Sequence, residues 1–115
     1  MSDNVALICL VEGDSKEKAF KVIAGINDDV NDLKEKIKGK KPNLFVNTDA
    51  NDIVLWKVNI SINDDMEIDV SLKNIQDKSK LSHPTRIINN IFTKLVADES
   101  IHIIVEQPSS KNRYI

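Results

Sequence analysis

The run Val5–Val11 constrains the fold more than any other part of the chain, because its side chains are apolar at odd and even positions alike. Neighbouring side chains of a strand point to opposite faces of a sheet. A strand that is apolar on both faces has to be covered on both, so this run predicts a central strand. It is also far shorter than the roughly 20 apolar residues that a membrane span requires.

A hairpin and a helix are predicted next along the chain. The polar turn 12–15 joins the first strand to a second one over Ala19–Ala24, which indicates an antiparallel pair. The Asn and Asp residues at 27–29 can cap a helix, and Gly39 and Pro42 mark its end. These signals predict a helix of about 11 residues. Its apolar stripe consists of Val30, Leu33 and Ile37.

The C-terminal half predicts another strand over Ile53–Ile60, with Leu55 and Lys57 on the face opposite its apolar side. The apolar side consists of Val54, Trp56, Val58 and Ile60. A weak extended stretch, Ile68–Leu72, is expected to add an edge strand, and 73–83 is expected to be a loop.

Pro84 precedes apolar residues at the spacing of a short helix, and Ser100–Glu106 is predicted as the last strand. The helix positions are Ile87, Ile88, Ile91, Phe92 and Leu95. The last strand is expected to place Ile101, Ile103 and Val105 on one face.

This order of elements is typical of an α+β fold, a ubiquitin-like β-grasp. It implies a mixed sheet of four to five strands, one main helix and a short second helix. In a β-grasp the first and last strands lie side by side at the centre, where the most continuous apolar runs belong. A split βαβ arrangement is the alternative. We expect one domain over 1–108 and a tail or the start of a linker over 109–115.

Five segments, taken in order, resemble the N-terminal header domain of Crinkler effectors in its fungal form. They are 7–13, 20–22, 30–38, 55–58 and 101–108. The sharpest match is Leu55-Trp56-Lys57-Val58, which resembles the Leu-Phe-Leu-Ala-Lys region of that family, although Trp56-Lys57-Val58 stands in place of Phe-Leu-Ala. The closing segment resembles the His-Val-Leu-Val…Pro junction that ends this N-terminal domain. Its candidate residues are His102, Ile104 and Pro108.

The resemblance implies a non-catalytic header domain that precedes a more variable effector domain. It also implies secretion into plant host cells by a non-classical route, host proteins as partners, and a role in host–microbe interaction. For the full-length effector, the resemblance also implies a location in the host nucleus. We expect this chain to be such an N-terminal domain alone or a shortened form of an effector.

Composition excludes several other classes of protein. Sixteen basic and eighteen acidic residues leave a net charge of −2, which argues against nucleic-acid binding by this domain. A single cysteine, Cys9, rules out a disulfide framework and a multi-cysteine zinc site, and its apolar strand predicts a buried, inert thiol. The sequence shows no glycine-rich phosphate loop, no paired carboxylates in an apolar setting and no usable triad, so we expect no enzyme, metal or cofactor. The tail 111–115 contains no Gly-Gly, so we do not expect a conjugated modifier.

Two surfaces are candidates for binding a protein. The first is a basic cluster at the C-terminal end of the main helix, where cations also complement the helix dipole. It consists of Lys34, Lys38, Lys40 and Lys41. The second is the sheet face that the main helix leaves uncovered, which would favour a partner or a homodimer if it is exposed. It is expected to contain Ile8, Leu10, Leu55 and Ile104.

An intracellular ubiquitin-like adaptor or scaffold module is the alternative function. In that case the basic cluster would bind the acidic loop 64–69 of another copy.

Overall fold

The computed structural model describes residues 4–61, 75, 77–92 and 100–107 of the chain. The strands of this part are β1 (Asn4–Val11), β2 (Phe20–Gly25), β3 (Leu55–Ser61), β4 (Ser79–Lys80) and β5 (Ser100–Val105). Its helices are α1 (Val30–Lys40) and α2 (Ile88–Ile91), with single 3₁₀ turns η1 (Lys16–Lys18) and η2 (Ala50–Asp52).

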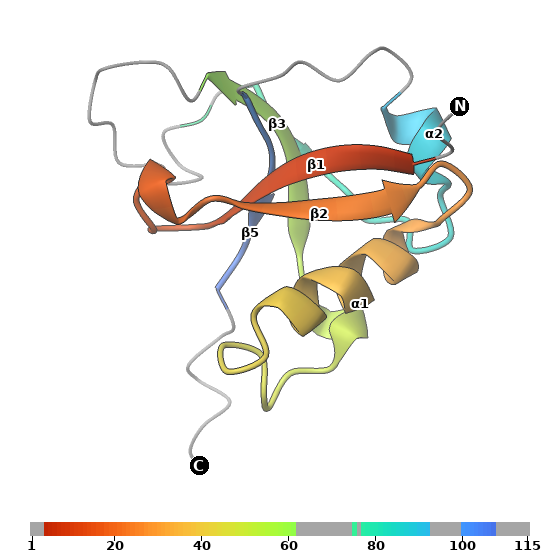
Figure 1. The fold of residues 1–115 in the computed structure, drawn as a ribbon. Coiled ribbons are helices and arrows are strands. Elements are labelled where there is room, and N and C mark those ends of the chain that lie inside the picture. Colours follow the sequence, from red (N-terminus) through yellow and green to blue (C-terminus); the bar gives the residue numbers. More distant parts are fainter. Residues whose placement is uncertain (1–3, 62–74, 76, 93–99, 108–115) are drawn as a thin grey trace.

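The strands form one mixed sheet in the order β2-β1-β5-β3-β4. The central pair β1 and β5 is parallel, with Cys9 opposite Ile103, and the other neighbouring pairs are antiparallel. Figure 1 shows the hairpin of β1 and β2 together with β5 and β3, and α1 to one side of them. The central position of β1 and the β-grasp arrangement are therefore confirmed, and the split βαβ alternative does not apply.

The helix α1 begins at a capping box. The carboxylate of Asp29 accepts a hydrogen bond from the backbone N–H of Asp32 at 2.9 Å, and the carboxylate of Asp32 accepts one from the N–H of Asp29 at 3.1 Å. These bonds satisfy backbone donors that have no partner within the helix. The helix has 11 residues, as its signals predict, and it buries the predicted stripe.

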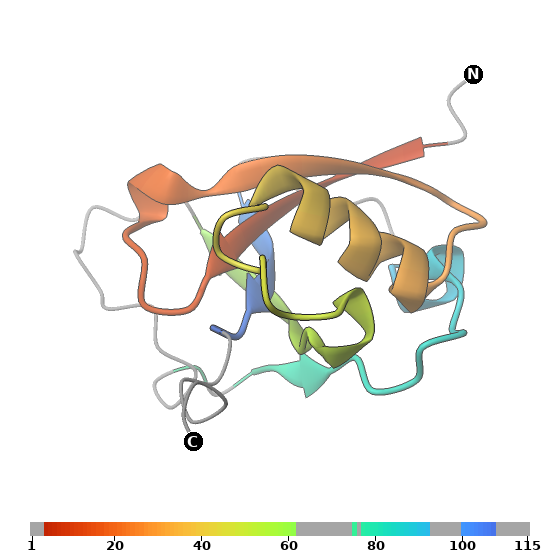
Figure 2. The ribbon, with the colours of Figure 1, turned by 90° about the horizontal axis from the view of Figure 1, so that it is seen from below.

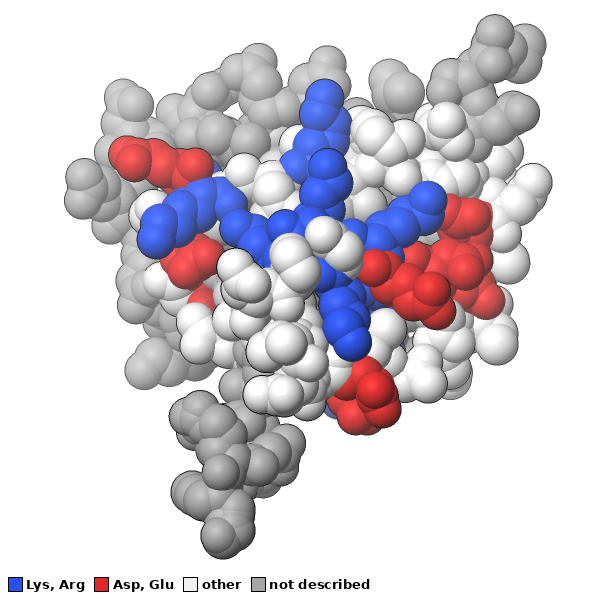
Figure 3. Space-filling model, turned by 60° about the horizontal axis from the view of Figure 1, so that its bottom comes forward, with Lys and Arg blue, Asp and Glu red and all other residues white. Residues whose placement is uncertain are grey.

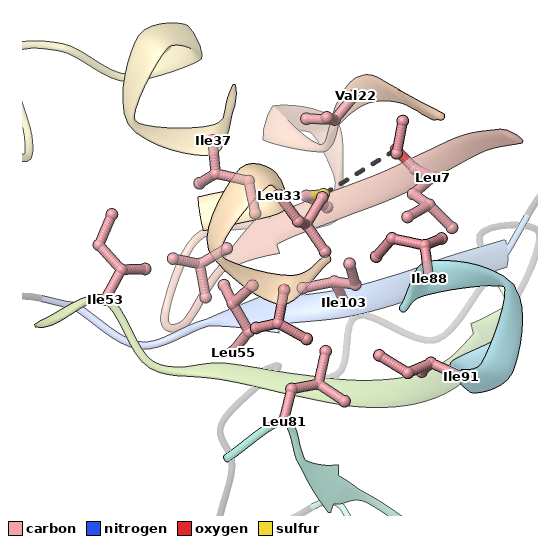
Figure 4. Close-up of a cluster of buried hydrophobic side chains, with 14 of the residues drawn as sticks. Leu7, Val22, Leu33, Ile37, Ile53, Leu55, Leu81, Ile88, Ile91 and Ile103 are labelled. Atoms are coloured by element: carbon pink, nitrogen blue, oxygen red, sulfur yellow. Dashed lines mark hydrogen bonds between the residues drawn. The ribbon is translucent and has the colours of Figure 1, made fainter. Parts of the chain in front are cut away.

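The main core lies between α1 and the sheet. Figure 4 shows Leu33 and Ile37 of the helix facing Leu55 and Ile103 of the sheet, with Leu7 beside them. Each of these five side chains has no exposed surface. The α2 residues Ile88 and Ile91 close the same core at one end. Burial of an aliphatic side chain of this size contributes about 1.5–3 kcal/mol, so this layer is the main source of stability.

The opposite face of the sheet carries a second buried cluster, which corrects the expected exposed apolar face. Its fully or nearly fully buried members are Leu10, Val58, Ile101 and Ile104. Leu10 and Ile104 have no exposed surface, and Ile8 is half-buried against them. Leu55 belongs to the α1 side instead, because β3 pairs Leu55 with Val105 and Trp56 with Ile104. That pairing register decides which face each residue of β3 occupies.

A β-bulge corrects a second expectation. The β3–β5 register shifts between Lys57 and Ile60, so Val58 and Asn59 stand opposite the single residue His102. The shift breaks the regular alternation along β5. Ile101 therefore lies in the second cluster with Ile104, whereas Ile103 and Val105 lie in the main core. The prediction that Ile101, Ile103 and Val105 share one face is therefore wrong.

The segment before α2 also departs from the expected loop. Within 73–83, residues Ser79 and Lys80 form the short edge strand β4 against β3. The helix α2 is short, as predicted, and a bridge between Asp29 and Ile87 joins its start to the start of α1. The predicted strand 68–72 lies outside the described residues, as does Leu95.

Candidate functional site

The segment Leu55–Val58, the sharpest part of the sequence resemblance, lies on β3 between the two hydrophobic clusters. Leu55 points into the main core and has no exposed surface, whereas Val58 is 6% exposed and belongs to the second cluster. Alternation along the strand thus places the four residues of this segment in both layers of the domain. The two members with polar side-chain atoms, Trp56 and Lys57, each donate a side-chain hydrogen bond.

Trp56 connects β3 to the end of β5. Its indole Nε1 donates a hydrogen bond to the carboxylate of Glu106 at 2.8 Å. The backbone N–H of Glu106 also donates to the carbonyl of Val54 at 3.0 Å. The ammonium group of Lys78 lies 5.8 Å from the centroid of the Trp56 ring, within the range of a cation–π contact. Trp56 is half-buried and packs against the second cluster, so it holds the end of the sheet together.

Lys57 connects β3 to α2. Its Nζ donates a hydrogen bond to the carbonyl of Ile91, the last residue of that helix, at 2.8 Å. The same ammonium group lies 5.4 Å from the ring centroid of Phe92. Carbonyls at the end of a helix lack partners within it and carry negative partial charge. Lys57 therefore caps α2 and fixes it against the sheet.

His102 connects β5 to β1. Its ring Nδ1 accepts a hydrogen bond from the backbone N–H of Ile8 at 2.9 Å, and the side chain is only 6% exposed. The described backbone pairing between these strands begins one residue later, with Cys9 opposite Ile103. The histidine thus extends the contact between the central strands at the position of the bulge. It has a structural role in the sheet.

The end of β5 is held by the turn after β1. The N–H of Glu12 donates to the carbonyl of Val105 at 2.8 Å, and the side-chain amide of Gln107 donates to the carbonyl of Glu12 at 2.8 Å. Gly13 in this turn has φ of 91°, a conformation that favours glycine. These contacts fix the direction in which the chain leaves the sheet at Gln107. Pro108 lies outside the described residues.

The predicted basic cluster does not form one surface. Lys34 is 8% exposed, and its Nζ lies 3.5 Å from the carbonyl of Asn51 in η2. Burial lowers the pKa of Lys34 below its usual value. The negative charge of Asp52 opposes this shift, and the positive charge of Lys80 adds to it. Lys38 is half-buried on the surface of α1.

Lys40 and Lys41 lie together with Lys18, a residue outside the predicted cluster. The three line an open depression of about 370 Å³ between the β1–β2 connection and the end of α1. The other lining residues are Val11, Asp14, Pro42, Asn43 and Leu44. Figure 3 shows basic side chains gathered in the middle of this side of the molecule, with acidic ones at either flank. Lys18 lies in a separate polar turn, so helical spacing could not assign it to this group.

Cys9 lies in the main core with no exposed surface, and its thiol lies 3.9 Å from the carbonyl oxygen of Leu7. Burial raises the pKa of this thiol to about 12, so it stays protonated at neutral pH. It is therefore an inert core residue. The described residues contain no cluster of three or more His, Cys, Asp or Glu side chains able to hold a metal ion. They also contain no helix long and apolar enough to cross a membrane.

The sheet order, the parallel central strands and the crossing helix define a ubiquitin-like β-grasp domain. The family model of the Crinkler effector protein N-terminal domain matches residues 5–106, and the chain belongs to this family. It is 35% identical over 107 residues to "Crinkler effector protein 1" of Rhizophagus irregularis. The match covers 93% of this chain and 22% of that relative, so the chain spans about a fifth of the relative's length. The resemblance inferred from the sequence is confirmed.

Proposed function

We propose that this domain is the N-terminal header domain of a Crinkler-type effector, which serves delivery into plant host cells and binds proteins without catalysing a reaction. The family match over nearly the whole chain carries this proposal. In this role the domain is secreted by a non-classical route, and any catalytic or nuclear activity belongs to the full-length effector.

The contacts of the candidate chemical groups support a non-catalytic role. A thiol needs to reach the thiolate state to act as a nucleophile, and burial of Cys9 opposes this. His102 uses its Nδ1 to accept a hydrogen bond from the backbone of β1. Both groups therefore contribute to the stability of the sheet.

The structural contacts of the resemblance residues indicate how delivery would depend on this domain. Trp56 and Lys57 hold β5 and α2 against β3, and Leu55 lies in the core. A receptor would therefore recognise the folded surface that this segment supports. Delivery should depend on the folded state of the domain and not on Leu55–Lys57 as an extended signal.

Two other hypotheses from the sequence lose support. A homodimer through the second sheet face would need exposed Leu10 and Ile104, which are buried. The intracellular adaptor would use the basic cluster, but Lys34 is turned toward Asn51 and does not share a surface with Lys40 and Lys41. The contacts of the described residues therefore favour neither as a second function.

A reporter fusion tests the delivery role. The chain is fused to a fluorescent reporter and expressed in a plant-colonising fungus, and reporter signal inside plant cells is measured. We expect uptake with the native domain and none with Leu33→Asp, which places a charge in the main core and unfolds the domain. The matched control is Lys80→Asp, at an exposed position of β4. Reporter confined to the hyphae with the native, folded domain would contradict the delivery role.

A further inference from the structure

The strand β2 is the outermost strand on one side of the sheet in the described part of the chain. It pairs with β1 on one side, and no strand of the described residues pairs with its other side. An edge strand presents unpaired N–H and C=O groups that can bind another extended chain. This edge has six residues and no proline, so it is long and regular enough to accept an added strand.

The two faces of β2 differ in their surroundings. Phe20, Val22 and Ala24 face α1 and pack on or within the main core. Lys21 and Ile23 alternate with them and are exposed, Ile23 at 47%. Side chains of an added strand would therefore meet an aliphatic contact at Ile23 on one face and α1 on the other.

Lysine side chains flank this edge on the side of α1. Figure 2 shows α1 alongside β2, and the helix ends near the beginning of the strand. The ammonium group of Lys41 lies 4.9 Å from the ring centroid of Phe20, the first residue of β2. Near the other end, Lys36 lies 3.5 Å from the carboxylate of Asp28, which also accepts a hydrogen bond from the N–H of Gly25.

The depression next to the start of β2 adds to this basic character. Lys18, Lys40 and Lys41 line it, and Asp14 is the acidic residue of its lining. Leu44, which is 38% exposed, gives it an apolar part. Lys41 of this open, mainly basic depression also contacts Phe20 at the start of β2, so the depression is suited to carboxylate side chains at one end of an extended peptide on that strand.

We propose that an extended protein segment with a short aliphatic run followed by acidic residues binds here as an added strand on β2. Its backbone pairs with the outer side of residues 20–24, an aliphatic side chain contacts Ile23, and its carboxylates lie beside Lys18, Lys40 and Lys41. This proposal depends on the proposed role of the domain as a binding module, and it names the chemical class of the partner.

The positive charge of the lysines beside β2 favours an acidic partner segment over the β2 strand of a second copy. Parallel pairing of two β2 edges would bring Lys21 and the neighbouring lysines of both copies together, and like charges across paired strands are destabilising. The same lysines attract an acidic strand. They therefore hinder self-pairing and favour the acidic partner.

The test uses a synthetic peptide with a run of alternating valine and isoleucine followed by a run of aspartate and glutamate. Nuclear magnetic resonance of the isotope-labelled chain follows its titration. We expect saturable shifts of the amide signals of residues 20–24, and slower hydrogen exchange at those that face outward, because added backbone bonds protect amides. The double variant Lys18→Glu/Lys40→Glu should weaken binding about tenfold. The matched control, Lys80→Glu on the exposed edge strand β4, should bind like the native chain.

Two further peptides separate charge from strand pairing. Replacing the acidic run by lysines should abolish binding, and placing a proline within the aliphatic run should also abolish it, because proline lacks the N–H. Shifts that map to the far sheet face, binding unchanged in the double variant, or concentration-dependent self-association through β2 in place of peptide binding would each overturn the proposal. The titration does not depend on delivery, so a failed reporter assay with intact peptide binding would contradict the delivery role alone.

Discussion

The indole Nε1 of Trp56 lies 2.8 Å from a carboxylate oxygen of Glu106, 50 positions later in the chain. This bond joins the segment that most resembles the family's signature to the end of the last strand. It shows that Trp56 acts within the domain as a structural residue, since its ring packs on the second cluster and its polar atom faces Glu106. Lys57, His102 and Cys9 are three further groups whose structural roles can be measured in the same way.

Removing the acceptor of the Trp56 bond should lower stability. Glu106→Ala should reduce the free energy of unfolding by about 1 kcal/mol, because the bond is charge-assisted but only partly buried. Glu106→Gln keeps an acceptor oxygen and should lose less. Urea unfolding followed by the fluorescence of Trp56, the one tryptophan of the chain, measures both variants. Equal stability of the alanine variant and the native chain would show that the bond contributes nothing.

Removing the ammonium group of Lys57 should loosen α2. Lys57→Met retains most of the aliphatic stem but leaves the carbonyl of Ile91 without this donor, at a cost of about 1–2 kcal/mol. Hydrogen exchange at the amides of Asn90 and Phe92 should become faster. Lys80→Met, at an exposed position of β4, is the control and should change stability by less than about 0.5 kcal/mol. The prediction fails if the two variants behave alike.

Removing the ring nitrogen of His102 should weaken the contact between the central strands. His102→Leu is similar in size but leaves the N–H of Ile8 without this acceptor, which should cost about 1–3 kcal/mol. Thermal unfolding measures the loss, and exchange of the Ile8 amide locates it. His102→Gln offers an oxygen that can accept the bond and should recover part of the stability. Fast Ile8 exchange already in the native chain would refute this account.

The buried thiol of Cys9 should make the chain less stable at high pH. Its pKa is raised from 9.0 to about 12, so between these values the unfolded chain loses a proton that the folded chain keeps. The unfolded state then binds fewer protons, and this contribution to the free energy of unfolding falls with rising pH by about 1.4 kcal/mol per unit. Cys9→Ala should lack this pH-dependent fall in the free energy of unfolding. Urea unfolding of both chains at about pH 8 and about pH 10.5, on either side of the thiol's ordinary pKa, tests the difference, and parallel pH profiles would rule it out.

The local elements of this fold follow from neighbouring residues. Asp29 and Asp32 form a capping box at the start of α1, and the spacing of Val30, Leu33 and Ile37 defines its buried face. The apolar run of β1 indicated a central strand for a similar reason, since both of its faces needed cover. Caps, turns and periodicity act over a few residues, so they can be read directly from the chain.

The positions of the candidate site residues could not be predicted in this way. Leu55 was expected on the uncovered face but lies under α1, because the β3–β5 register is set by contacts between segments far apart in the chain. The bulge beside His102 moves Ile101 to the other face, and no local pattern signals it. Helical spacing places Lys34 and Lys40 in one predicted cluster. In the structure η2 covers Lys34, whereas Lys40 is exposed.

The sequence by itself determined the family, the order of most elements and the face that α1 buries. Only the tertiary structure decided that Trp56 and Lys57 are structural contacts, and that β2 is an outermost strand of the described sheet beside lysines from two separate segments. The physical reason is the range of the interactions. Helix caps and apolar periodicity depend on residues a few positions apart, whereas strand register and surface charge depend on residues that only folding brings together.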